Sequence, residues 1–380
     1  MPDLNPPPVN PLIELHRQAE AETQPYGEIE IVSTFGEPQA EYAAIRKGAA
    51  LMDLPQRGIL EMTGKDRLPF LNNLITNQVW DKQAKQGIEA GKGVYAFLLD
   101  ARAGRIQADM NVLERGESTW LEMDARLIEP TRLALEKYRF AEQVKIRSRV
   151  GELHQIGIHG PGAQAILGES IVGLEPTRCA SAKLLDIEVT VWRDDPAGVP
   201  GYYLIAGAAD AQGLWENLIE KWGQPTDLGK RTLRRIGWAA YNAARIEGGR
   251  ALFGVDFDNS ILPAETGELL NRAVSFTKGC YPGQEIVARM HARQQVAKKL
   301  VGIRMDGDAL PIAGTKILDD KDNEIGGITS STVSPVLSNV AICLGFLKRP
   351  HFNLGTKVRI PAEGSMREGT VVELPFLKNL

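Results

Sequence analysis

The pattern of the sequence changes near Lys299, and this change constrains the fold more than any other feature. From there on, short strand-like stretches are separated by Gly, Asp, Asn and Pro, which is typical of a small barrel-like domain. The predicted strands are Lys299–Met305, Lys316–Leu318, Glu324–Thr332, Val340–Leu347, Lys357–Ile360 and Gly369–Glu373. Before this point strands and helices mix without strict β-α-β alternation, so the pattern favours an α+β fold over a doubly wound sheet.

Length and composition exclude several classes of protein. A chain of 380 residues exceeds one compact core, so two or three domains are expected. The 44 basic and 48 acidic residues give a net charge of −4, which argues against direct nucleic-acid binding. No apolar run of about 18 residues is present, and Met1 to Pro11 does not resemble a secretory signal. We therefore expect a cytoplasmic protein that makes no membrane contact.

The three cysteines, Cys179, Cys280 and Cys343, are odd in number and widely spaced. This spacing argues against a disulfide framework and agrees with a reducing compartment. Three cysteines also exclude a self-contained four-cysteine metal site, and we expect no tightly bound metal.

Several local patterns predict individual elements ahead of the barrel. Gly93–Asp100 and Ile106–Leu113 alternate as two strands of a hairpin, and residues 1–24 are expected to form a loose arm. Helices are predicted at Leu12–Glu22, Glu37–Gly48 and Leu228–Glu247.

The segment Lys278-Gly279-Cys280-Tyr281-Pro282-Gly283-Gln284-Glu285 is the most informative for chemistry. Pro282 and Gly283 close a loop, and Gln284 and Glu285 begin a helix. Cys280 then lies just before a helix N-terminus and two residues from Lys278, and both features favour a thiolate. Glu285 acts against this effect. Cys179 and Cys343 fit the alternative of small buried apolar residues, whereas Cys280 has polar neighbours.

This segment closely resembles the K-G-C-Y-x-G-Q-E signature of the YgfZ-type folate-binding proteins, a family that includes proteins assisting iron–sulfur cluster assembly. Further segments resemble the glycine-cleavage T-protein, an aminomethyltransferase of the same superfamily. These are Tyr42–Arg46 with Asp53-Leu54, Glu61–Asp66, Ile158–Pro161, Arg245–Gly249, Phe253–Asp256 and Leu262–Glu265. Only the proline-rich N-terminal arm has no counterpart.

The resemblance implies a three-domain aminomethyltransferase-like fold around a central channel that binds tetrahydrofolate. The first domain would combine residues 25–54 and 147–243, and the second would combine 55–146 and 244–297. The barrel would span 298–380.

The same resemblance suggests roles for individual residues. Glu247 matches the T-protein glutamate that holds the pterin, since a carboxylate can accept two adjacent N–H groups; the alternative is a solvated surface charge. Asp109 falls where the T-protein keeps its catalytic aspartate, with an exposed polar strand residue as the alternative. Cys280 and Lys278 are the other predicted catalytic residues. The remaining predicted folate contacts are Tyr281, Gly283, Gln284, Glu265 and Arg289. For Arg289 a solvated basic face is the alternative.

Two functions follow from these features. The first is a tetrahydrofolate-binding accessory protein that supports iron–sulfur cluster assembly or repair, and so indirectly tRNA modification, through Cys280. Its partners would be folate and iron–sulfur proteins or assembly factors, because one cysteine cannot hold a four-iron cluster. The second is a tetrahydrofolate-dependent one-carbon transferase that uses Glu247 and Asp109. The cysteine loop favours the first, as does Ser275, which takes the place of a folate-contacting arginine of the T-protein. Whether the protein is an enzyme stays open at this point.

Overall fold

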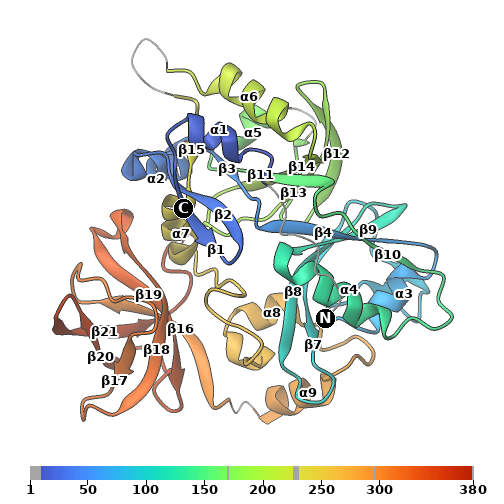
Figure 1. Ribbon diagram of the computed structural model, residues 1–380. Helices are drawn as coiled ribbons and strands as arrows, with labels where there is room; N and C mark the ends of the chain where they lie inside the picture. The colour runs from blue at the N-terminus through green and yellow to red at the C-terminus, as the bar shows by residue number, and fades with distance from the viewer. Residues whose placement is uncertain (1–9, 169–170, 226–230, 294–295, 379–380) are drawn as a thin grey trace.

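The computed structural model describes residues 10–168, 171–225, 231–293 and 296–378. A mixed sheet, an antiparallel sheet and a closed barrel lie around the middle of the molecule, with helix α7 (Trp238–Glu247) among them (Figure 1). Helices and strands are not segregated into β-α-β units. The predicted α+β class is therefore confirmed.

The first sheet has six strands in the order β12-β13-β14-β11-β3-β15. Its strands are β3 (Ala49–Asp53), β11 (Leu153–His159), β12 (Cys179–Leu184), β13 (Ile187–Arg193), β14 (Gly201–Gly207) and β15 (Leu233–Ile236). Helices α5 (Ala163–Leu167) and α6 (Ala211–Trp222) contribute buried residues, including Trp215, to the same apolar core.

The helix predicted over Leu228–Glu247 is wrong in its first half. Residues 233–236 form β15, which pairs in parallel with β3, and the helix α7 starts only at Trp238. Leu233 and Ile236 are the buried residues of β15, and their spacing of three imitates a helical face. The first residues of the predicted segment, 228–230, lie outside the described residues.

The second sheet has five antiparallel strands in the order β10-β4-β9-β8-β7. They are β4 (Arg57–Thr63), β7 (Gly93–Leu99), β8 (Ile106–Glu114), β9 (Ser118–Asp124) and β10 (Lys145–Ser148). The predicted hairpin of β7 and β8 is confirmed. The short helices and strands around this sheet are α3 (Arg67–Asn72), β5 (Trp80–Asp81), β6 (Gln86–Gly87), η1 (Ala125–Leu127) and α4 (Ile128–Glu136).

The predicted barrel is confirmed: it is closed, with the strand order β16-β19-β18-β17-β20-β21. Its elements are β16 (Lys298–Met305), β17 (Lys316–Leu318), β18 (Glu324–Ser334), η4 (Pro335–Leu337), β19 (Val340–Lys348), β20 (Lys357–Ala362) and β21 (Ser365–Val372). Arg245 of α7 joins the barrel to the rest of the fold: it donates to the carboxylate of Asp256 at 2.6 Å and to Ser330 of β18 at 2.7 Å.

The N-terminal segment differs from the predicted loose arm. From Asn10 on it is packed, with Leu12 and His16 fully buried, while residues 1–9 lie outside the described residues. Asp53 accepts hydrogen bonds from Asn10 at 2.8 Å and from the Nε2 atoms of His16 at 2.8 Å and His154 at 2.6 Å. The elements here are α1 (Ile13–Gln18), β1 (Glu22–Tyr26), β2 (Ile29–Thr34) and α2 (Pro38–Lys47). Hydrogen bonds to the buried Asp53 hold this segment in place. Asp53 lies far along the chain, so the local sequence of the segment does not reveal this partner.

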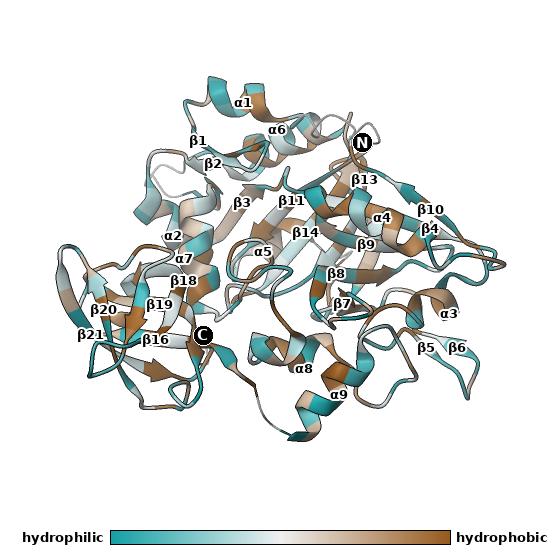
Figure 2. Cartoon of the chain, turned by 60° about the horizontal axis from the view of Figure 1, so that its bottom comes forward, coloured by the Kyte–Doolittle hydropathy of each residue, from teal (hydrophilic) through white to brown (hydrophobic). Residues whose placement is uncertain are grey.

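Three elements link the second sheet to the barrel: η3 (Pro263–Thr266), α8 (Leu269–Ala273) and α9 (Gln284–Arg293). The helix predicted after the cysteine loop is confirmed as α9, which buries Val287 and exposes its charged residues. Bands of polar and apolar colour along α4 and α9 in Figure 2 show the same amphipathic character. Among the described helices, none has the length and apolar character needed to cross a membrane.

Candidate functional site

A polar cavity lies where the two sheets, α7 and the segment 250–253 meet. Its empty space is about 740 Å³, a figure that includes solvent at the open mouth. Its lining combines charged and aromatic side chains: Tyr26, Leu54, Gln56, Arg57, Tyr95, Asp109, Asn111, Glu122, Trp192, Asp194, Pro196, Tyr203, Trp238, Tyr241, Arg250, Ala251, Leu252 and Phe253.

Asp109 is the predicted catalytic residue that lines this cavity. It lies on β8, two residues from Asn111, so strand alternation presents both side chains on the same face. The hydroxyl of Tyr95 donates to Asp109 Oδ2 at 2.8 Å. Burial raises the pKa of Asp109, while the positive charge of Arg57 and the hydrogen bond from Tyr95 oppose this rise. The alternative of an exposed strand residue is excluded by its burial.

Beside Asp109, a buried ion pair connects β4 and β9. Arg57 Nε and Nη2 donate to the two carboxylate oxygens of Glu122 at 2.6 and 2.7 Å. Asn111 donates to the same carboxylate at 2.8 Å and Gln155 at 3.1 Å. These contacts fix the guanidinium of Arg57 in the cavity wall.

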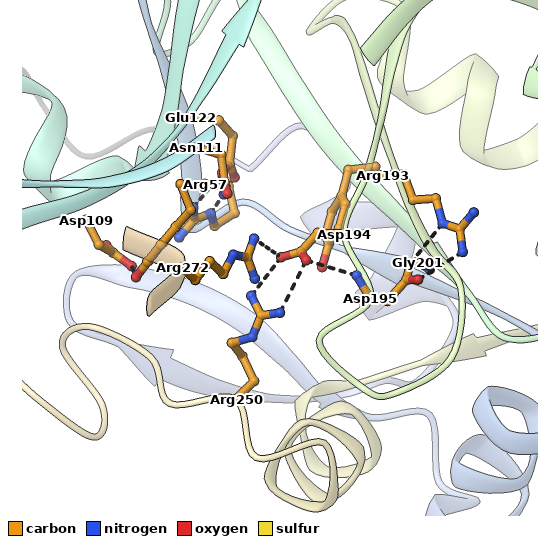
Figure 3. A network of polar contacts seen from close by, with 12 residues as sticks. Arg57, Asp109, Asn111, Glu122, Arg193, Asp194, Asp195, Gly201, Arg250 and Arg272 are labelled. Carbon is orange, nitrogen blue, oxygen red and sulfur yellow. Dashed lines mark hydrogen bonds and ion pairs between the residues drawn. The ribbon is translucent and has the colours of Figure 1, made fainter. Parts of the chain in front are cut away.

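A second charged cluster lies across the cavity, as Figure 3 shows. Asp194 follows β13, and its Oδ2 accepts from Arg250 and from Arg272, each at 2.9 Å. The neighbouring carboxylate of Asp195 pairs separately with Arg193.

The aromatic lining provides flat apolar surface next to these charges. Trp192 stacks on Tyr203 with a centroid distance of 4.3 Å and an interplanar angle of 15°. The hydroxyls of Tyr203 and Tyr241 are 3.4 Å apart, and burial raises the pKa of both. Aromatic faces with a few fixed polar groups suit a heteroaromatic ring.

The predicted residues of the cysteine loop lie elsewhere. None of them is among the residues that line the cavity. Tyr281, Gly283, Gln284 and Arg289 instead share a shallow surface depression with Arg102. Cys280 is exposed, whereas Cys179 and Cys343 are buried.

The buried side chain of Lys278 anchors this loop to the segment that follows α3. Its Nζ donates to the backbone carbonyls of Asn72, the last residue of α3, and of Ile75 and Asn77 in the connection to β5. Burial lowers the pKa of Lys278 to about 7, and the positive charge of Lys82 adds to the effect. The three carbonyls match the three hydrogens of an ammonium group.

The two predicted glutamates also lie outside the cavity lining. Glu247, at the end of α7, is fully buried and accepts from Tyr42 at 2.7 and 2.8 Å, and also from Arg46 and Ser334. The alternative of a solvated surface charge is excluded by this burial. Glu265 accepts from the backbone N–H of Leu262 at 3.0 Å and so caps its own short helix. The structure thus brings Asp109 to the cavity, but neither glutamate.

The sequence prediction missed Arg57, Glu122, Asp194 and Arg250. Glu122 carried a usable signal, because it is a charge inside the otherwise apolar run Trp120-Leu121-Glu122-Met123. The other three lie at strand ends or in connections, where a charged residue is ordinary. Among the described residues, no group of three or more His, Cys, Asp or Glu side chains is placed to hold a metal ion.

The fold defines the class of protein. The crystal structure of a glycine cleavage system aminomethyltransferase T from Bartonella henselae superposes with a TM-score of 0.84, at 22% identity and with 97% of each chain covered. The predicted aminomethyltransferase-like fold is therefore confirmed. Residues 12–278 match the GCVT N-terminal domain, and residues 298–378 match the glycine cleavage T-protein C-terminal barrel domain. The chain belongs to the glycine cleavage T-protein family.

Curated relatives span almost the whole chain. A protein of Chloroherpeton thalassium named aminomethyltransferase is 28% identical over 97% of this chain and 98% of its own length. A Bacillus subtilis protein of the same name is 26% identical over 97% of this chain and 98% of its own length. These full-length relatives overturn the prediction of an accessory protein for iron–sulfur cluster assembly and favour the alternative of a one-carbon transferase. The prediction was wrong because it gave more weight to the resemblance of the eight-residue cysteine loop than to the resemblance of the rest of the chain.

Proposed function

We propose that the protein is a tetrahydrofolate-dependent aminomethyltransferase-like enzyme whose reaction takes place in the Asp109 cavity. The observation that carries the proposal is a buried carboxylate among aromatic and arginine side chains, in a chain of the T-protein family. Folate is the one-carbon acceptor, and an aminomethyl compound is the donor.

The reaction needs no oxidant. A donor X–CH2–NH2 gives its methylene carbon to the two N–H groups of tetrahydrofolate, so that ammonia and X–H leave with the displaced hydrogens. Positive charge develops on nitrogen as the carbon changes partner. The carboxylate of Asp109 stabilises this charge at short range, in a site where burial strengthens electrostatic interactions.

The remaining residues bind and orient. Tyr95 holds one carboxylate oxygen of Asp109, and Arg57 favours its ionised form. The stacked pair of Trp192 and Tyr203 offers a flat face for the pterin ring. Predicted contacts from Glu247, Glu265, Tyr281, Gly283, Gln284 and Arg289 stay predictions; for Glu247 and Glu265 the hydrogen bonds of the fold already use their carboxylates.

An assay of the purified protein tests this function. Tetrahydrofolate is titrated first, and aminomethyl donors are then supplied while methylenetetrahydrofolate and ammonia are measured. We expect folate to bind and both products to appear in equal amounts. Failure to bind tetrahydrofolate, or binding without turnover across carrier-bound and free donors, contradicts the proposal.

The cysteine loop supports a narrower proposal. Its resemblance to the YgfZ type suggests a branch of the superfamily in which Cys280 acts as a reactive thiol, in a cytoplasmic protein. Burial raises the pKa of Cys179 to about 11 and of Cys343 to about 12, so iodoacetamide at pH 8 should modify Cys280 first. Equal modification of all three thiols in the folded protein would count against this role.

A further inference from the structure

The charges that line the cavity are not evenly spread, and this asymmetry indicates what a ligand must carry. On the side of β8 and β9, two carboxylates, Asp109 and Glu122, face one guanidinium, Arg57. Glu122 accepts from Arg57, Asn111 and Gln155. Within the part of the chain that the structure describes, Asp109 accepts only from Tyr95. This end therefore carries an excess of negative charge, and Asp109 has acceptor capacity left.

The opposite end has an excess of positive charge. One carboxylate, Asp194, pairs with two guanidinium groups: Arg250, which lines the cavity, and Arg272, which lies outside the cavity lining. Both of its oxygens are used, because Oδ1 also accepts from Arg250 at 3.3 Å and from the backbone N–H of Asp195 at 3.0 Å. Among the described contacts, Arg250 Nε and Arg272 Nη1 have no acceptor, so this end can still donate to an anion.

Tyr95 lies between the two ends. Its hydroxyl donates to Asp109, while the guanidinium carbon of Arg272 lies 4.8 Å from the centre of its ring. Tyr95 thus contacts both ends, and Figure 3 shows Asp109 and Asp194 on opposite sides of Arg272.

The positive end also has an opening of its own. Arg250 and Arg272 line a second depression between α8 and the barrel, together with Thr266, Leu300 and Leu374. Glu268 lies at its rim, but it is exposed and its charge is screened by water. A carboxylate can therefore lie at the two arginines without passing the Asp109 end.

We propose that this site selects a ligand with opposite charges at its two ends, a nitrogen cation at Asp109 and a carboxylate at Arg250 and Arg272. The inference rests on the proposed function and names the substrate chemistry of that site. Two molecules can supply the carboxylate: the glutamate tail of folate, or a small amino-acid-like donor.

Binding measurements with and without the carboxylate test the inference. The ligands are tetrahydrofolate, 6-methyltetrahydropterin, which lacks the tail, and glycine added to protein saturated with 6-methyltetrahydropterin. The variant Arg272→Gln removes the excess positive charge and leaves the Asp194–Arg250 pair intact. Arg272→Lys keeps the charge. Arg193→Gln is the matched control, since it removes a similarly exposed arginine from a neighbouring pair.

We expect Arg272→Gln to weaken the binding of one of the two carboxylate ligands about tenfold, while 6-methyltetrahydropterin binds as before. In Arg272→Lys and Arg193→Gln the binding affinities should change little. If only the binding of tetrahydrofolate weakens, the carboxylate belongs to the folate tail. If only the binding of glycine weakens, the carboxylate belongs to the donor. As a second variant on exposed surface, Glu268→Gln should tighten the same ligand about twofold.

Other results overturn the inference. If reduced pterins bind but Arg272→Gln affects all ligands equally, or none, the ends of the cavity do not discriminate charge. If the parent protein binds no reduced pterin, the proposed function itself fails and the inference fails with it. Thermal unfolding of each variant separates these results from loss of the fold.

Discussion

The Asp109 cavity and the cysteine loop differ in how they are built. The loop is contiguous, resembles a specific signature, and leaves Cys280 exposed at the surface. The cavity draws its charged lining residues from three strands and two connections. The ion pairs at the cavity join residues far apart in sequence, with Arg57 and Glu122 65 residues apart and Asp194 and Arg272 78 apart. The contrast teaches that a conspicuous motif marks a segment, whereas a reaction needs residues that only the fold assembles.

The largest effect should come from breaking the buried pair of the cavity. Arg57→Met removes the cationic partner of the buried Glu122 carboxylate and should lower the free energy of unfolding by about 3 kcal/mol. The exposed Arg102 beside the cysteine loop is the comparison, and Arg102→Met should change stability little. Urea unfolding measures both.

A second change at the partner sharpens this result. Glu122→Gln added to Arg57→Met keeps the hydrogen-bonding shape but removes the orphaned charge, so much of the lost stability should return. No recovery would show that packing, and not charge, holds the two strands together at this point.

Next in size is the effect of Asp109 on turnover. Asp109→Asn removes the negative charge and should reduce kcat about 100-fold or more, while tetrahydrofolate still binds. Cys280→Ser should keep kcat within a factor of about two. Steady-state assays of the two variants decide the comparison, and the reverse ranking would move the reaction to the loop.

The anchor of the loop should have a moderate effect. Lys278→Met leaves three backbone carbonyls without their donor and should cost about 2 kcal/mol of unfolding free energy. Cys280 should also react faster with iodoacetamide as the loop loosens. Lys82→Met, an exposed neighbour, is the control. Unchanged stability in Lys278→Met would mean that water replaces the amine without penalty.

The smallest effect concerns pH. Burial raises the pKa of Asp109, so kcat/KM should fall as pH drops through a value above the usual aspartate range. The positive charge of Arg57 lowers the pKa of Asp109, so Arg57→Met should move this acid limb to higher pH, whereas Arg57→Lys should not. A limb that stays in place in Arg57→Met contradicts electrostatic coupling between the two residues.

Local patterns in the sequence predicted much of the fold. Patterns within a few neighbouring residues were enough for three features: the barrel strands, the β7–β8 hairpin and α9. These patterns were alternation of apolar and polar residues, turn residues and a helix start. β15 was missed because a short parallel edge strand depends on its distant partner β3, and the N-terminal arm was missed because Asp53 lies far along the chain.

The site was predictable only in part. Asp109 was found through resemblance, and its strand position agrees with a buried site. Arg250 and Asp194 were not found, because a charged residue in a connection carries no sign of its partner 56 residues away. Glu247 was expected to face a ligand, although its buried partners Tyr42 and Ser334 come from α2 and β18.

A crystal structure of the protein with tetrahydrofolate tests the central claim most directly. We predict the pterin ring in the cavity, with a ring nitrogen within hydrogen-bond distance of Asp109 and its flat face toward the aromatic lining. Density for the ring at the surface depression beside Cys280, with the cavity free of ligand, would contradict the account.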